Sequence, residues 1–90
     1  IDSGASHAIR EKGRSLLPAG VVKVKGTFSS GELIAIEDEH SRTVAKGLSN
    51  YSSQEISLIK GRHSKEIMGI LGYSAYHEIV HRNNMAVEEL

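Results

Sequence analysis

The chain contains no cysteine and no tryptophan, and its 90 residues include one proline, one phenylalanine and three tyrosines. Without cysteine it can form neither a disulfide nor a thiolate metal site, the two devices on which small secreted domains usually depend. With so few aromatic side chains, the core must be built from isoleucine, leucine, valine and alanine. The composition therefore indicates one modest aliphatic core and a single domain over residues 1–90.

Long apolar runs are also missing. No stretch approaches the roughly 18 apolar residues that a membrane-spanning helix needs, and no basic-then-apolar signal peptide opens the chain. The hydrophobic fraction of 39% and the charged fraction of 24% are typical of a soluble globular domain. We therefore expect a cytoplasmic protein with no membrane partner.

The formal net charge is zero, whereas many nucleic-acid-binding domains are strongly basic. The charge is unevenly spread, because residues 1–31 carry five basic and two acidic side chains, and residues 32–59 carry two basic and five acidic ones. A neutral protein can still present a basic face. The charge balance therefore weakens the case for nucleic-acid binding without excluding it.

The first predicted element is a helix over residues 3–12, where apolar side chains recur at helical spacing. Asp2 or Ser3 can cap its free amides, and Gly13 supplies a stop at its end. Pro18 lacks an amide donor and favours an extended residue before it, so the helix cannot continue beyond that point.

Two further helices are predicted in the second half of the chain. Ser52 and Glu55 form a capping box, in which each side chain accepts a hydrogen bond from the backbone amide of the other residue. This box explains both residues as structural and not as a nucleophile and its base. A third helix is expected between Ser64, which can cap it, and Gly72, which ends it.

Five segments have strand patterns. Residues 22–25 alternate valine and lysine, residues 33–36 form a short apolar run before an acidic turn, and residues 42–46 return after it. Residues 78–81 and 85–87 are rich in β-branched and apolar side chains. The short loops favour antiparallel neighbours. We predict an α+β fold, a small sheet or barrel of mixed, mainly antiparallel strands with short helices at its rim.

Several short sequence motifs occur in the order that is typical of one family. The chain resembles the carboxy-terminal PUA domain of glutamate 5-kinases over essentially its whole length. The motifs that carry the resemblance are Gly13-Arg14-Ser15-Leu16-Leu17-Pro18-Ala19-Gly20-Val21-Val22-Lys23-Val24, Gly47-Leu48-Ser49-Asn50-Tyr51-Ser52-Ser53, Ile59-Lys60-Gly61, Ile70-Leu71-Gly72-Tyr73 and His81-Arg82-Asn83-Asn84. One departure is visible, since the family commonly has aspartate where Asn83 stands.

The resemblance implies a PUA-type pseudo-barrel, and Ile1-Asp2 resembles the end of its first strand, which is then truncated at Ile1. It also implies a parent enzyme that uses ATP and Mg to phosphorylate the side-chain carboxylate of L-glutamate, the first step of proline synthesis. That chemistry belongs to an amino-acid-kinase domain on the amino-terminal side. No catalytic residue carries over to this chain, and we expect no catalytic, cofactor or metal site in it.

His77-Glu78-Ile79-Val80-His81 satisfies the H-E-x-x-H pattern of zinc proteases. The pattern binds zinc only on a helix, where residues i and i+4 are neighbours. On a strand the two imidazoles would lie about 13 Å apart at ~3.3 Å per residue. Because Ile79 and Val80 favour a strand, we interpret the pattern as a coincidence and not as a metal site.

Two basic sets are candidates for binding RNA or phosphate. Lys60, Arg62, His63 and Lys65 lie within six residues, where the alternative is a solvated loop. Arg10, Arg14, Lys23 and Lys25 form the other set, and the resemblance implies that the first helix and the following strand face RNA in those PUA domains that bind it. The alternative is an exposed helix flank.

The three tyrosines have two interpretations as well. Tyr51, Tyr73 and Tyr76 could stack on bases, but such side chains more often fill the edge of a core. Three functions therefore stay open. The chain is an accessory domain that shapes the assembly or proline regulation of its kinase, with the kinase domain and further copies of itself as partners; or it binds structured RNA; or it is the RNA-binding PUA module of an RNA-modifying enzyme.

Overall fold

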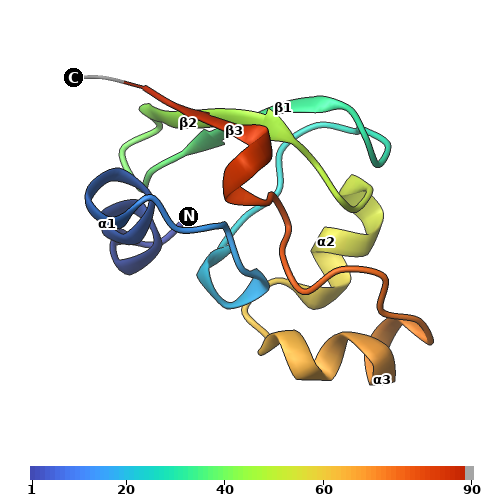
Figure 1. Ribbon diagram of the computed structural model, residues 1–90. Helices are drawn as coiled ribbons and strands as arrows, with labels where there is room; N and C mark the ends of the chain where they lie inside the picture. The colour runs from blue at the N-terminus through green and yellow to red at the C-terminus, as the bar shows by residue number, and fades with distance from the viewer. Residues whose placement is uncertain (89–90) are drawn as a thin grey trace.

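The computed structural model describes residues 1–88 (Figure 1). The fold consists of a three-stranded antiparallel sheet with short helices around it. The strands lie in the order β1-β2-β3. The elements follow the chain as α1 (Ser3–Lys12), a 3-10 helix (Pro18–Gly20), β1 (Leu33–Glu37), β2 (Thr43–Leu48), α2 (Ser53–Ile59), a 3-10 helix (Ser64–Glu66), α3 (Ile67–Leu71), a 3-10 helix (Arg82–Asn84) and β3 (Met85–Val87). The predicted α+β class is confirmed.

The helices predicted from their caps are present. Asp2 accepts from the amide of Ala5 at 2.7 Å and so caps α1, and Gly13 ends it with a φ of 59°. The capping box of α2 is complete, with bonds of 3.2 Å to Ser52 and 2.8 Å to Glu55.

The third predicted helix starts differently from our expectation. It is divided into a 3-10 turn over Ser64–Glu66 and the α-helix α3. His63, and not Ser64, is the cap, because its Nδ1 accepts from the amide of Lys65 at 3.2 Å. The Ser64 hydroxyl instead donates to the carbonyl of His77 at 2.9 Å.

The hairpin between β1 and β2 is confirmed and runs from the pair Leu33 and Leu48 to the pair Glu37 and Thr43, with a bulge after Ile36. β3 pairs with the other edge of β2, from Ala45 opposite Val87 to Gly47 opposite Met85. This arrangement makes β2 the central strand, so its inward side chains are the best covered in the sheet.

Two predicted strands are wrong. Residues 22–25 belong to no strand, because no other described segment lies in hydrogen-bonding position beside them. Residues 78–81 form only an isolated bridge, in which Leu16 pairs with Val80. The bridge cannot lengthen past Leu16, since the chain turns into a 3-10 helix at Pro18, which has no amide to donate.

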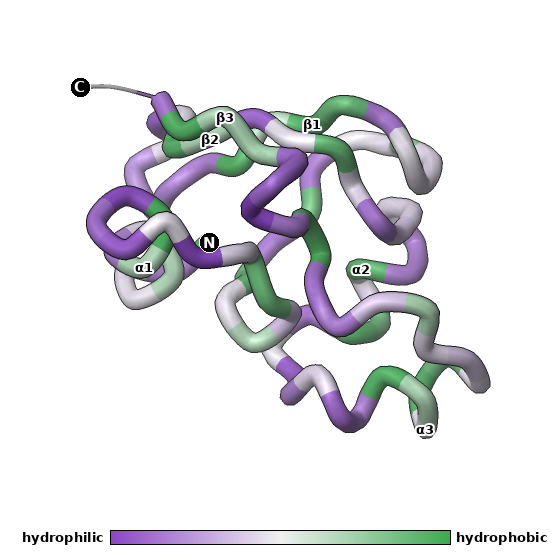
Figure 2. Tube along the Cα trace, viewed as in Figure 1, coloured by the Kyte–Doolittle hydropathy of each residue, from purple (hydrophilic) through white to green (hydrophobic). Residues whose placement is uncertain are grey.

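The core lies between the sheet and the helices, and Figure 2 shows its hydrophobic segments distributed over several short elements. Val44, Ile59, Ile67 and Val80 are fully buried. The other buried apolar side chains are Ile9, Leu16, Val21, Ile36, Ala45, Tyr51, Ile56 and Ile79. Apart from Tyr51 the core is aliphatic, as the scarcity of aromatic residues predicts.

Candidate interaction surfaces

An open groove of about 830 Å³ runs along the free edge of β1. Its second wall is the extended segment 21–28, and Ile1 and Asp2 contribute to its lining. The Ile1 nitrogen donates to the Glu37 carbonyl at 2.7 Å, and the Asp2 amide donates to the Gly20 carbonyl at 3.0 Å. The first two residues therefore connect the two walls.

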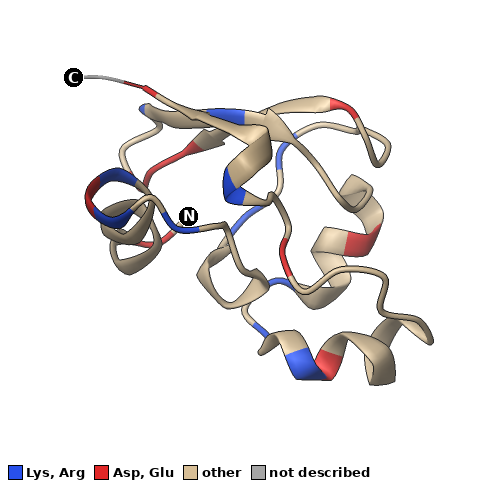
Figure 3. Cartoon of the chain, viewed as in Figure 1, with Lys and Arg blue, Asp and Glu red and all other residues tan. Residues whose placement is uncertain are grey.

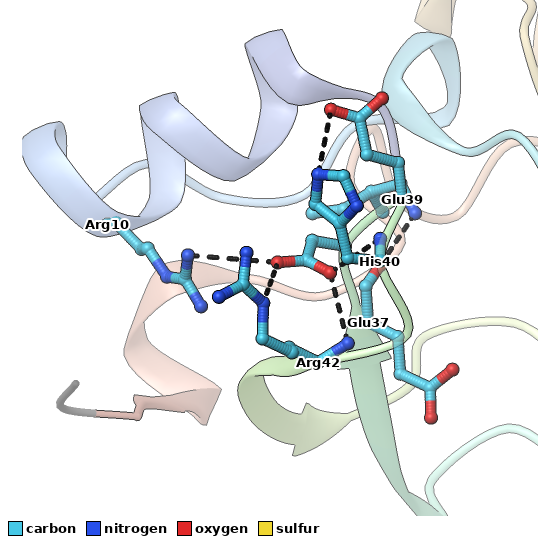
Figure 4. A network of polar contacts seen from close by, with 7 residues as sticks. Arg10, Glu37, Glu39, His40 and Arg42 are labelled. Atoms are coloured by element: carbon cyan, nitrogen blue, oxygen red, sulfur yellow. Dashed lines mark hydrogen bonds and ion pairs between the residues drawn. The ribbon is translucent and has the colours of Figure 1, made fainter.

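A polar network centred on Asp38 lies in the turn between β1 and β2. Arg10 from α1 and Arg42 from the turn point toward the same carboxylate (Figure 4), with N–O distances of 3.9 Å and 3.6 Å. The Asp38 carboxylate also accepts from the amides of His40 at 2.9 Å and Arg42 at 3.0 Å. These contacts fix the turn and join it to α1.

The hydrogen bond from the Arg42 amide is the largest cause that lowers the pKa of Asp38 below its ordinary value of 3.8. Partial burial opposes this shift, while the His40 amide and the charge of Arg42 add to it. The folded state therefore binds the Asp38 proton less readily than the unfolded chain does.

Because the pKa of Asp38 is lower in the folded state, its contribution to stability is present above pH 3.8 and is lost as the pH falls through the folded-state pKa. We expect urea unfolding, measured between pH 6 and pH 2, to show a smaller decline for Asp38→Asn than for the wild type. Glu39→Gln, at an exposed neighbour, is the matched control and should retain the wild-type decline. An unchanged decline in Asp38→Asn would contradict this role.

The predicted basic residues lie in different surroundings. Arg10 is mostly buried, and its Nε and Nη2 have no hydrogen-bond partner among the described residues. Lys23 is exposed on one wall of the groove, and neighbouring Lys25 bonds to Glu37 at 2.8 Å. Arg14 is exposed beside a second groove, of about 460 Å³, that lies next to α1.

The second basic set lies in the loop between α2 and α3. Lys60, Arg62, His63 and Lys65 are all exposed, but Arg62 pairs with Glu66 at 3.8 Å and His63 serves as a helix cap. Figure 3 shows the cations of α1 and those beside α3 toward opposite ends of the molecule. The cations of α1 therefore share no face with those beside α3, and binding of RNA or phosphate by either set stays a prediction.

Tyr51 is a buried core residue. Its hydroxyl donates to the Tyr76 carbonyl and accepts from the Tyr76 amide at 3.2 Å, and the two rings meet edge to face with centroids 6.2 Å apart. Tyr73 and Tyr76 are about half exposed. Tyr51 therefore supports the loop that carries Tyr76 and is unavailable for stacking on a base.

The H-E-x-x-H segment, residues 77–81, is not helical. The His81 Nε2 lies 3.9 Å from the Glu78 carboxylate, and the His81 Nδ1 accepts from the Asn83 amide at 3.1 Å. The His81 Nδ1 thus already has a hydrogen-bond partner within the chain. Within residues 1–88, no three histidine, aspartate or glutamate side chains are grouped so that they could hold a metal ion. Among the same residues no helix is long and apolar enough to cross a membrane.

Sequence comparison and the fold together identify the family of this chain. The sequence profile of the PUA domain matches residues 1–71. The chain belongs to the PUA domain family. A solved structure of a PUA domain from Aeropyrum pernix K1 superposes on this PUA domain with a TM-score of 0.67 and 28% identity, covering 91% of this chain and 39% of that one.

Curated relatives of this PUA domain are named glutamate 5-kinases. The enzyme of Thermus thermophilus is 49% identical over 89 residues, which is 99% of this chain and 24% of the kinase. That of Vibrio vulnificus is 48% identical over 87 residues, covering 97% of this chain and 23% of the kinase. The chain thus spans about a quarter of the length of these relatives.

Asp38 is the residue that the sequence interpretation missed. We assigned Glu37-Asp38-Glu39 to an acidic turn and gave none of the three a particular role. The local signal was available, because an aspartate side chain that accepts from the amide two residues later forms a common turn motif. The contact with Arg10 had no such signal, since the two residues are far apart in the sequence.

Proposed function

We propose that this PUA domain is the carboxy-terminal accessory domain of a glutamate 5-kinase. In such an enzyme a separate amino-acid-kinase domain uses ATP and Mg and moves the γ-phosphate to the side-chain carboxylate of L-glutamate, which yields L-glutamyl 5-phosphate and ADP. The observation that carries the proposal is the uneven coverage: the relatives are 45–49% identical over 97–99% of this chain, but only 23–24% of each kinase is matched. The rest of such a chain supplies the catalytic domain, and the whole enzyme is cytoplasmic.

The proposed role of the domain is to shape the assembly of the kinase or its feedback inhibition by proline. Several large apolar side chains at its surface support docking on the kinase domain or on a second copy. Leu58, Met68, Val22 and Leu33 are 56–67% exposed, on α2, α3 and the two walls of the first groove. Exposed apolar side chains are common one by one, but they supply the contact area that a domain interface needs.

The test compares the full-length kinase with a variant that lacks residues 1–90. Glutamate phosphorylation at saturating ATP and Mg should persist, because the catalytic groups belong to the other domain. One expected result is a changed oligomeric state, measured by light scattering. The other is a weakening of proline inhibition by roughly 5- to 150-fold, which is the change in affinity that ordinary coupling free energies between two sites produce.

The retained turnover is the internal control that the kinase domain is still folded. An unchanged oligomeric state together with unchanged proline inhibition would contradict the proposed role. A parent chain whose upstream sequence shows a synthase or transglycosylase pattern, and which does not phosphorylate glutamate, would instead favour an RNA-modifying enzyme.

A further inference from the structure

Helix α1 and the extended segment that follows it enclose the second groove, of about 460 Å³. Ala5 and Ala8 line the wall formed by α1, while Ser15 and Leu17 line the other wall. The two walls meet at one end, where a Cβ on Gly20 would lie 2.6 Å from the Cβ of Ala5. The groove is therefore closed beside Gly20, and its lining there consists of small apolar side chains.

The wall that contains Ser15 and Leu17 has unpaired backbone groups. Leu16, between them, donates to the Val80 carbonyl at 2.9 Å and accepts from the Ile79 amide at 2.8 Å. Backbone groups alternate between the two sides of an extended chain, so those of Ser15 and Leu17 turn away from this bridge. Among the described residues, the Ser15 amide, the Ser15 carbonyl and the Leu17 amide have no hydrogen-bond partner. Because Ser15 and Leu17 line the groove and Leu16 does not, these three groups face it.

Two cations lie at the other end of the groove. Lys12 is the last residue of α1, about 10 Å along the helix from Ala5 at ~1.5 Å per residue, and Arg14 follows shortly after it. Both side chains are exposed, and within residues 1–88 neither forms an ion pair. Asp2, the acidic residue of the lining, lies at the closed end, where its amide donates to the Gly20 carbonyl at 3.0 Å. The groove therefore offers unpaired positive charge at one end only.

An extended acidic peptide fits these features together. Its backbone can pair with the unpaired edge, an apolar side chain can cover Ala8 and Leu17, and a carboxylate can meet the two cations. Nucleic acid fits less well, because none of the described lining residues is aromatic and the Asp2 carboxylate would repel a phosphate. The geometry of the groove therefore favours a peptide partner.

We propose that the second groove binds an extended acidic segment of the kinase domain in the parent chain. The kinase domain is supplied by the proposed function, on which this assignment rests. Under that function the chain continues upstream from Ile1, and the neighbouring Asp2 lines the groove. The kinase domain is thus tethered beside the groove, and a short tether raises the effective concentration of a segment to about the millimolar range. A segment of weak intrinsic affinity would then be held in place.

The groove also determines the sequence pattern of the segment that binds in it. Side chains on one face of an extended segment recur at every second residue, about 7 Å apart. We therefore expect an apolar residue against the alanines of α1 and an acidic residue two positions away, beside Lys12 and Arg14. Because both cations are exposed, the contact should weaken as the ionic strength rises above about 0.1 M, where the screening length is ~10 Å.

Zero-length carbodiimide crosslinking of the full-length parent, followed by mass spectrometry, tests the charged contact. The reagent joins an amine to a carboxylate without a spacer, so it should link Lys12 to an aspartate or glutamate of the kinase domain. Lys12→Arg keeps the charge but removes the reactive amine, and this variant should lose the link. Lys60→Arg, at an exposed lysine in the loop between α2 and α3, is the matched control and should retain the Lys12 link.

Hydrogen exchange on the same full-length protein tests the backbone pairing. The two groove-facing amides should exchange on the order of 10-fold more slowly than unpaired amides. The double variant Lys12→Glu with Arg14→Glu should lose this protection, because the reversed charges repel an acidic segment. Lys60→Glu with Lys65→Glu is the matched reversal in the other basic set and should keep it. The amides that join β2 to β3 should stay protected in every variant, which shows that the domain remains folded.

Four results would overturn the assignment of the groove. In the first, the wild-type parent shows neither the Lys12 link nor protection of the groove-facing amides. In the second, Lys12 links to residues 1–90 of a second copy. In the third, ribonuclease treatment removes the protection, so that RNA fills the groove. In the fourth, the protection survives the charge reversal, so that the occupant is not acidic. Glutamate phosphorylation, assayed on the same samples, tests the proposed function separately, because a parent that retains this activity and gives any of the four results loses only the groove assignment.

Discussion

Gly47→Ala is expected to destabilise the domain by about 3 kcal/mol, because no room exists for a methyl group at this position. A Cβ on Gly47 would lie 2.5 Å from Cγ1 of Val80 and 2.7 Å from the carbonyl oxygen of Asn84. The first contact is with a fully buried side chain and the second with backbone, so neither neighbour can move aside at low cost.

The close approach at Gly47 is what brings three segments together. Gly47 lies in β2, pairs with Ile34 of β1 and Met85 of β3, and is covered by the bridge residue Val80. A side chain here would push β3 and the preceding 3-10 helix away from the sheet. The expected loss thus includes strand pairing as well as local overpacking.

Gly69→Ala is the matched control, since it is the same substitution at an exposed glycine. Gly69 lies in α3, and a Cβ there would meet no atom within 4 Å. Alanine is the better helix former, so this variant should gain roughly 0.5–1 kcal/mol. Urea denaturation of both variants measures the difference. A Gly47→Ala midpoint equal to that of the wild type would show that the sheet and the Val80 bridge are looser than their packing indicates.

The parts of the fold that the sequence predicts correctly are those with local causes. Helix α1 is defined by its cap Asp2 and its stop Gly13, and α2 by the box of Ser52 and Glu55. The hairpin of β1 and β2 follows from two apolar runs on either side of an acidic turn. In each case the residues that determine the element lie within a few positions of it.

The parts that failed depend on distant partners. Residues 22–25 have the alternation of a strand, but a strand needs a neighbour, and none of the described residues supplies one. Residues 78–81 have strand-forming side chains, yet their partner segment turns away at Pro18. Propensity describes how well a residue suits a strand, and pairing decides whether the strand forms.

The candidate binding residues show the same limit. Arg10 belongs to a basic set in the sequence, but the fold buries most of its side chain and places its Nη1 3.9 Å from the Asp38 carboxylate. No spacing rule predicts a pair so far apart in the sequence. Lys23 and Arg14, in contrast, are exposed beside the two grooves.

The second large effect is expected at Ile59, the last residue of α2, whose side chain is fully buried. Ile59→Ala removes three carbon atoms from a core that has few large side chains to fill the space. Such a change costs about 2–5 kcal/mol, and Ile59→Val, which removes one carbon, should cost roughly 0.5–1.5 kcal/mol. The graded pair separates loss of packing from any effect on the helix itself.

Leu58→Ala is the matched control for Ile59→Ala, because the neighbouring side chain is 61% exposed on the same helix. It should change the free energy of unfolding by about 0.5 kcal/mol or less. Equal losses at the two positions in urea denaturation would contradict the assignment of Ile59 to the core.

Ile59→Ala also offers a second approach to the proposed function. Small domains have total stabilities of about 5–15 kcal/mol, so a loss of about 2–5 kcal/mol brings a domain at the low end of that range close to its unfolding midpoint. In the full-length kinase, Ile59→Ala should then reproduce the effect of deleting the domain on assembly or proline inhibition. Ile59→Val, which should leave the domain folded, is the control and should behave as the wild type. Leu58 is among the exposed side chains that the proposed docking uses, so Leu58→Ala should alter assembly or inhibition while the domain itself stays folded.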